Sequence, residues 1–243
     1  MNPRSKKHLP CVAVCTLGLC ALGFTVSSRV ELHDQYVLAR GGRLYDRWTS
    51  EIEAGNPQER HVSYPEKGTY ARKTALTWRC KECHGWDYKG AAGAYRQGTH
   101  FTGINGIQKA IGMPPEEVVE LLKSPIHAFG DKLSDQDLDA LALFVSQGQA
   151  DLTAEIDSEG VVMGDIETGR GHFQNLCSSC HGISGREIDD MPALGALSRK
   201  NPWECFHKIL NGAPGTKMPA LRSLDRQVSI DILAYLQTLP DES

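Results

Sequence analysis

The sequence has no long apolar run beyond its first 26 residues, no low-complexity block and no excess of basic residues. The absence of further apolar runs excludes a protein with several membrane-spanning helices, since each span needs about 20 apolar residues. The 26 basic and 30 acidic residues give a net charge of −4, which argues against a nucleic-acid partner. The hydrophobic share of 40% is enough for a folded core, so a wholly disordered chain is excluded as well.

The one apolar run lies at the N-terminus, at residues 9–26. The segment before it is basic, with Arg4, Lys6, Lys7 and His8. Because Ser28 is small enough to suit a signal peptidase, residues 1–28 are predicted to be a signal peptide that directs export to the periplasm. The alternative is an uncleaved N-terminal anchor that holds the chain at a membrane, since the run approaches spanning length.

Removal of residues 1–28 changes both the charge and the cysteine count. The remaining chain has 23 basic and 30 acidic residues, and so a net charge of about −7. Five of the eight cysteines remain, namely Cys80, Cys83, Cys177, Cys180 and Cys205. An odd number of cysteines argues against a framework of disulfides.

Four of these five cysteines belong to one pattern that occurs twice. Residues 80–84 read Cys-Lys-Glu-Cys-His and residues 177–181 read Cys-Ser-Ser-Cys-His. This pattern is typical of the attachment site of c-type haem. Cysteines three positions apart on a helical turn point the same way, so they can form thioethers to the two vinyl groups on one porphyrin edge. The histidine that follows becomes the proximal iron ligand.

The sequence therefore predicts two covalently bound haem c groups as cofactors. The residues expected to form the thioethers are Cys80, Cys83, Cys177 and Cys180. The expected proximal iron ligands are His84 and His181.

Two other chemistries use pairs of cysteines at this spacing. Two pairs could supply four thiolates to one zinc ion, and a single pair can act as a thiol redox couple. Neither explains a histidine directly after each second cysteine. Export also favours haem c, which is attached outside the cytoplasm.

The two halves of the chain show the same order of elements around the motif. A helical segment at 165–176 runs directly into the second motif, and residues 40–45 resemble part of it. An insertion at about 49–77 separates residues 40–45 from the first motif, and its glycines and prolines are typical of a loop. A loop of this length is either functional or poorly ordered. One possible function is to serve as a docking surface for an oxidoreductase.

After each motif the chain continues with a glycine-rich loop, a helix that opens with proline, a short loop and a final helix. Pro114 marks the start of the first proline-led helix. Asn201 and Glu204 predict a capping box at its counterpart in the second half. Ser134 and Asp137 predict another at the final helix of the first half.

This all-α order of elements resembles the class I cytochrome c fold, over about 39–148 and 160–240. Two such units in tandem are similar to the dihaem cytochrome c4 type. The resemblance implies a cytochrome c domain at 39–150 that contains the insertion, and a second at 160–243, each wrapped round a covalent haem. Residues 151–164 are then the linker.

The resemblance also implies a methionine ligand in the loop before the last helix. Met218 stands in such a loop and is expected to be the second axial ligand of the second haem iron. Met191 is expected to pack in the proximal loop instead.

The first half has no methionine in the matching loop. His127 is the strong ligand in that loop and is predicted to be the second axial ligand of the first haem iron. Met113, His100 and an open or water-bound iron are the alternatives.

These ligands predict an electron carrier that passes single electrons between a donor and an acceptor, which are redox proteins in the periplasm or at a membrane. An iron with both axial positions filled has no open site for substrate. The His/Met iron is expected to have the higher potential, so electrons would run from the first unit to the second. The alternative is a dihaem redox enzyme, peroxidase-like or thiosulfate-oxidising, with an open or displaceable ligand at the first haem.

The sequence also predicts the surroundings of four further residues. Cys205 is predicted to be a buried thiol on a helix. His172 and His207 are expected on solvated helix surfaces. His61 lies in the insertion, where no partner for it is evident.

Overall fold

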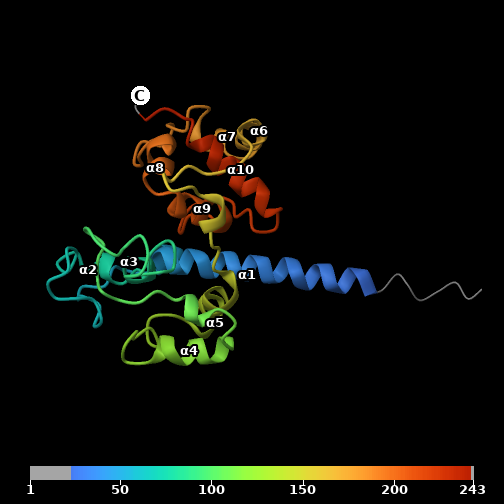
Figure 1. Ribbon diagram of the computed structural model, residues 1–243. Helices are drawn as coiled ribbons and strands as arrows, with labels where there is room; N and C mark the ends of the chain where they lie inside the picture. The colour runs from blue at the N-terminus through green and yellow to red at the C-terminus, as the bar shows by residue number, and fades with distance from the viewer. Residues whose placement is uncertain (1–22, 242–243) are drawn as a thin grey trace, which may run out of the picture.

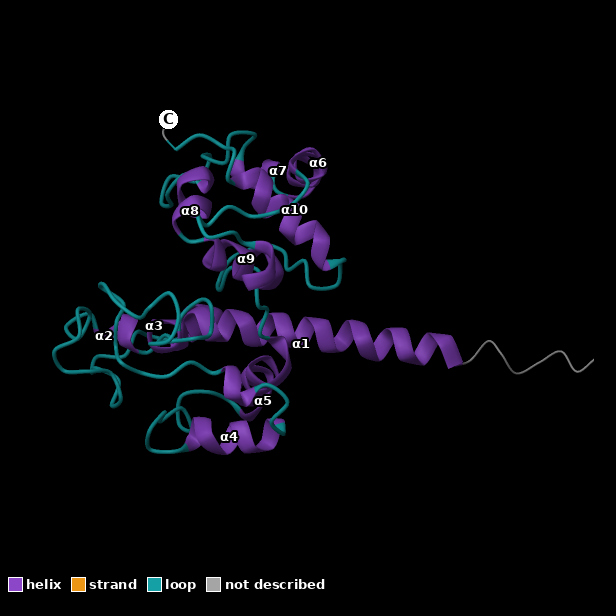
Figure 2. Cartoon of the chain, in the orientation of Figure 1, coloured by secondary structure: helices purple, strands orange, loops and turns teal. Residues whose placement is uncertain are grey.

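The computed structural model describes residues 23–241, and this part of the chain is helical without β-strands (Figures 1 and 2). Two isolated β-bridges occur in this part of the chain, one between Gly90 and Asn105 and one between Ile156 and Val162. The helices are α1 (Gly23–Glu51), α2 (Thr74–Thr77), α3 (Cys80–His84), η1 (Gln108–Ala110), α4 (Pro115–Lys123), α5 (Asp135–Leu143), η2 (Phe144–Gly148), η3 (Thr153–Glu155), α6 (Ile166–Leu176), α7 (Ser178–His181), α8 (Leu194–Lys200), α9 (Pro202–Asn211) and α10 (Arg226–Leu236). A helical architecture of this kind fits a cytochrome c fold.

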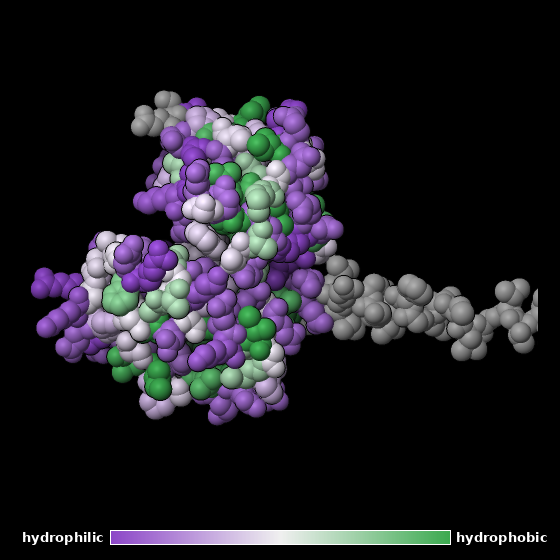
Figure 3. All heavy atoms as spheres, in the orientation of Figure 1, coloured by the Kyte–Doolittle hydropathy of each residue, from purple (hydrophilic) through white to green (hydrophobic). Residues whose placement is uncertain are grey.

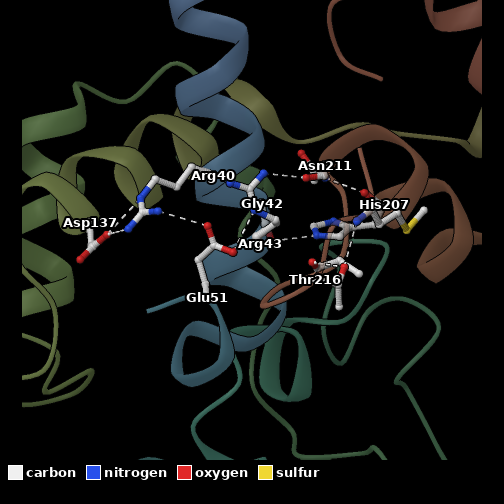
Figure 4. Close-up of polar contacts among 10 residues, drawn as sticks. Arg40, Gly42, Arg43, Glu51, Asp137, His207, Asn211 and Thr216 are labelled. Carbon is white, nitrogen blue, oxygen red and sulfur yellow. Dashed lines mark hydrogen bonds and ion pairs between the residues drawn. The ribbon is translucent and has the colours of Figure 1, made fainter. Parts of the chain in front are cut away.

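The N-terminal helix α1 lies between the other helices, with α4 and α5 on one side and α6 to α10 on the other (Figure 1). It is interrupted near its end, where Arg47 has non-helical angles (φ −157°, ψ 84°). Residues 11 positions apart would lie about 16 Å apart along a straight helix. Because of the interruption, Glu51 turns back and accepts hydrogen bonds from Arg40 (3.2 Å) and Arg43 (2.9 Å) (Figure 4).

Two clusters of buried hydrophobic residues form the core of the described structure. The first draws on α1, α4, α5 and η2, and its fully buried members include Leu44, Tyr45 and Phe144. The second draws mainly on α6, α9 and α10, and its fully buried members include Phe173 and Leu233. Each cluster holds one copy of the cysteine–histidine motif at its edge, since Cys80 packs against the first and Cys177 against the second.

The predicted helix starts are confirmed by their caps. The Asn201 side chain accepts from the Glu204 N–H at the start of α9, and Ser134 accepts from the Asp137 N–H at the start of α5. Each cap satisfies one of the backbone donors that a helix N-terminus leaves unpaired. Helix α4 begins at Pro115, directly after Pro114, where a missing N–H costs nothing.

Two expected loops differ from the prediction. The insertion expected at 49–77 is shorter, because α1 runs to Glu51 and α2 covers Thr74–Thr77, which leaves 52–73 as the loop. The expected linker at 151–164 does not stand free, because Leu152 and Val162 are buried in the second core cluster. Apolar side chains at these two positions account for the difference, since burying them removes apolar surface from water.

His207 lies where the two halves meet, and its expected solvated position is wrong. The residue is 1% exposed. Its Nε2 donates to the Gly42 carbonyl on α1 at 2.9 Å (Figure 4). Its Nδ1 lies 2.9 Å from the Tyr88 hydroxyl. Burial lowers the pKa of His207 to about 4, so the ring is neutral near pH 7.

A buried carboxylate ties the same two halves together. Asp46 is 1% exposed and contacts Arg79 before the first motif and Lys208 on α9, the latter at 2.7 Å. Burial by itself would raise the pKa of Asp46, but Lys208 and Arg79 outweigh it and hold the pKa at about 2. The carboxylate is therefore charged and paired over the physiological range.

The surface carries no broad apolar face in the view of Figure 3, where hydrophobic residues lie in small groups between hydrophilic ones. Residues 1–22 of the predicted signal peptide lie outside the described residues, and 23–28 belong to α1. Among the described helices, none combines the length and the apolar character needed to cross a membrane.

The neutral, buried His207 predicts a pH-dependent stability. Its pKa is about 4 in the folded protein against 6.5 for an ordinary histidine, so the unfolded chain binds the extra proton first as the pH falls. The free energy of unfolding should therefore fall by roughly 3 kcal/mol between pH 6.5 and pH 4 because of this group. Denaturant unfolding across this range should show a shallower pH dependence in His207→Gln than in the wild type.

His172→Gln, on α6, is the matched control for the loss of a histidine away from the junction. Equal slopes in the wild type and His207→Gln would contradict the assignment.

Candidate functional site

A cavity in the first half brings the predicted ligands together. The cavity is partly open, and its space together with the solvent at its mouth amounts to about 710 Å³. Its walls come from α1, the segment from Thr77 to His84, η1, α4, the loop after α4, α5 and η2. The lining includes Cys80, Cys83, His84 and His127 together with apolar side chains such as Val118, Leu122, Phe129 and Leu141.

The two thiols of the first motif are sheltered from water. Burial raises the pKa of Cys80 and of Cys83 to about 12. A thiol that stays protonated at pH 7 is a poor nucleophile and a poor zinc ligand, which argues against a thiol redox couple at this motif. Both side chains face the cavity, as attachment to one edge of a bound porphyrin requires.

His84 is held with one ring nitrogen bonded to the main chain. Its Nδ1 lies 2.7 Å from the Asn105 carbonyl, so Nδ1 carries the proton and Nε2 keeps its lone pair. Burial lowers the pKa of His84 to about 4, which also keeps the ring neutral. A neutral imidazole with a carbonyl at its other nitrogen is the usual form of a metal-ligating histidine.

A glycine allows the loop after the first motif to present that carbonyl. Gly90 has φ +53° and pairs with Asn105, and a Cβ at Gly90 would lie 2.5 Å from the Ile104 carbonyl oxygen. The two segments of the loop therefore lie closer together at Gly90 than a residue with a side chain would allow.

His127 faces His84 across the cavity. The two ring centres are 6.3 Å apart, with 35° between the ring planes. Two imidazoles bound to opposite sides of one metal, each through a bond of about 2 Å, would have ring centres roughly 6 Å apart. The His127 Nδ1 lies 2.9 Å from the Leu121 carbonyl, so Nε2 again keeps its lone pair. These residues fit a metal atom held between two imidazoles.

The alternative ligands of the first half do not line this cavity. His100 bonds Glu82 through Nδ1 at 2.8 Å and stacks on Tyr95 with ring centres 4.7 Å apart. Met113 packs against the outside of the first core cluster. Of the three, His127 is the residue that the fold places opposite His84.

The second motif is more open to solvent than the first. Cys177 and His181 are half-buried and Cys180 is exposed. Burial raises the pKa of Cys177 to about 11 and lowers the pKa of His181. Cys177 caps the short helix α7, which carries the rest of the motif directly after α6, as the sequence predicts.

Met218 lies in the loop between α9 and α10 and is half-buried. Gly212 opens this loop with φ +80°, and a Cβ there would lie 2.6 Å from the Met218 carbonyl oxygen. The Leu221 N–H donates to the Ile209 carbonyl at 3.1 Å and closes the loop onto α9. Ligation by Met218 stays a prediction.

A shared zinc site does not form in the part of the chain that the structure describes. No group of three or more histidine, cysteine or acidic side chains is arranged there to hold a metal ion. All five cysteines from Cys80 to Cys205 are free thiols. Cys205 is buried on α9, as predicted.

His61 is the residue that the sequence analysis missed. It lines the cavity, is 6% exposed, and bonds the His127 carbonyl through Nε2 at 2.9 Å. Its partner is a main-chain atom 66 positions away, which no pattern of side chains in the sequence reveals.

Comparison with known families bears on the second half. Residues 164–236 match the family model described as cytochrome c oxidase, cbb3-type, subunit III. The match supports a c-type cytochrome. The matched range contains the second motif and Met218, and it implies haem c with its iron as a cofactor. A search of curated proteins found no match.

The two motifs predict a specific pattern of haem loss. If each pair supplies its own thioethers, as the motifs predict, Cys80→Ser/Cys83→Ser should remove one of two haem groups and Cys177→Ser/Cys180→Ser the other. Intact-mass spectrometry together with haem absorbance would count the groups per chain. Cys205→Ala is the control and should keep both. A wild-type chain with a single haem would contradict the pattern.

Proposed function

We propose that this chain is an exported dihaem c-type cytochrome that carries single electrons between redox partners in the periplasm or at a membrane. The observation that carries the proposal is the cavity that faces His84 toward His127, with both motif cysteines in its wall. The repeat of the motif at 177–181, inside the range that matches a cytochrome family, supports a second site of the same kind. We propose the two cytochrome c domains at 39–150 and 160–243.

Each residue of the first site has a definable task. Cys80 and Cys83 would hold the haem covalently, and His84 and His127 would bind its iron through Nε2. When bound, haem c supplies one-electron chemistry at its iron. The apolar walls exclude water from the site, and the carbonyls at the two Nδ1 atoms hold the rings in place.

A filled pair of axial positions favours a carrier over an enzyme. An enzyme of the peroxidase or thiosulfate-oxidising type needs one iron with an open or displaceable ligand. The His127 ring is directed into the cavity and anchored at Nδ1, which supports a closed site. One wall of the cavity reaches the surface at Leu121, which is 48% exposed, and this is the proposed point of approach for a redox partner.

The proposed ligands set an order of potentials. The thioether of Met218 at the second site favours ferrous iron more than a second imidazole does. The second site should therefore have the higher potential, and electrons should pass from the first unit to the second. The net charge of about −7 after removal of residues 1–28 would steer a basic partner toward this chain at low salt.

A redox titration tests the order of potentials. In the fully loaded protein, the second haem should be reduced first as the potential is lowered. The Cys80→Ser/Cys83→Ser variant retains the second haem alone and assigns its midpoint. Reduction of the second haem last would contradict the proposed ligands.

Activity assays separate the carrier from the enzyme. A carrier should exchange electrons with small redox proteins and should turn over neither peroxide nor thiosulfate. Sustained turnover of either substrate that is lost with the first haem would favour the enzyme instead.

A further inference from the structure

The insertion at 52–73 contacts the loop that carries His127. The His61 Nε2 donates to the His127 carbonyl at 2.9 Å, and the Ser63 hydroxyl donates to the Ile126 carbonyl at 2.5 Å. Two adjacent carbonyls of the His127 loop are therefore held by one short stretch of the insertion.

The His61 ring is itself held in one orientation. The Ser63 N–H donates to its Nδ1 at 3.1 Å, which leaves the proton on Nε2 for the His127 carbonyl. The ring packs edge-on against Trp78, with ring centres 4.5 Å apart, and lies 6.0 Å from Phe129. A buried donor with a defined tautomer makes a well-oriented hydrogen bond.

The same stretch is also tied to the segment that leads into the first motif. The His61 N–H donates to the Thr77 hydroxyl at 3.0 Å, and the Trp78 indole N–H donates to the Glu59 carbonyl at 2.9 Å. Thr77 and Trp78 lie three and two positions before Cys80 and line the cavity. The insertion therefore connects the segment that leads into Cys80 with the loop that carries His127.

The backbone next to His127 adopts an unfavourable conformation. Ala128 has φ +54°, the left-handed region that a residue with a side chain adopts at a cost. The carbonyl that His61 holds belongs to the peptide between His127 and Ala128. A strained peptide persists when its surroundings over-determine it, and here one of the surrounding groups is His61.

We propose that His61 is a positioning residue, which holds the His127–Ala128 peptide and so keeps the His127 imidazole on the iron of the first haem. This rests on the proposed function, because it takes His127 as an iron ligand. The insertion is then a brace that closes the first site to external ligands.

Carbon monoxide binding to the reduced, fully loaded protein tests this, since the gas can bind only after an axial ligand leaves. His127→Ala should speed one kinetic phase strongly, and that phase is assigned to the first haem. His61→Phe keeps the ring contacts but loses the donor, and it should speed the same phase about 2- to 10-fold, the effect of one hydrogen bond. His61→Gln can still donate to the carbonyl and should stay near the wild-type rate.

Ser63→Ala is a second variant that leaves the His61 ring in place, and it should speed the same phase in the same direction. His172→Phe is the matched control on α6 and should leave the phase unchanged. Thermal unfolding, recorded in parallel, separates a general loss of stability from an effect on the site.

A His61→Phe protein with lower stability but an unchanged carbon monoxide phase would overturn the positioning role of His61. An unchanged rate in Ser63→Ala would overturn the part of the proposal in which the insertion holds the His127 loop. An unchanged rate in His127→Ala would instead overturn the ligand on which the proposed function depends.

Discussion

The first site depends on two hydrogen bonds from imidazole to main chain. Each bond takes up the Nδ1 proton, of His84 at the Asn105 carbonyl and of His127 at the Leu121 carbonyl, and so directs the Nε2 lone pair into the cavity. The rest of the first half places those two carbonyls. Gly90 lets one loop close tightly, and the Leu121 carbonyl lies in the last turn of α4, where it also accepts from the Ser124 hydroxyl at 2.6 Å.

Helix α1 connects this site to the second half. Arg40 contacts Asp137 on α5, while Arg43 donates to the Asn211 carbonyl on α9 (Figure 4). Asp46 and His207 add buried polar contacts across the same junction. Buried polar groups of this kind are costly when unpaired, so they favour one arrangement of the two halves over others. A fixed arrangement suits a protein in which an electron is proposed to pass from one half to the other.

Local patterns in the sequence predicted much of this structure. The helix starts at Asn201 and Ser134 and the helical turn of each motif are set by neighbouring residues, so their spacing was informative. The prediction of His127 rested on its place in the loop between two helices, and the structure has it in the loop between α4 and α5. The errors concern residues whose partners are distant in sequence. His207 and His61 bond carbonyls 165 and 66 positions away. Any residue can supply a main-chain carbonyl, so no sequence motif identifies the partner in such a hydrogen bond.

The central claim is that the first iron is held between two imidazoles while the second has a histidine and a methionine. Low-temperature EPR of the fully oxidised protein, purified with both haem groups attached, tests this most directly. Two low-spin ferric signals are expected, one of them typical of bis-histidine ligation and absent from His127→Ala. A high-spin signal from the first haem of the wild-type protein would mean an open iron and would contradict it.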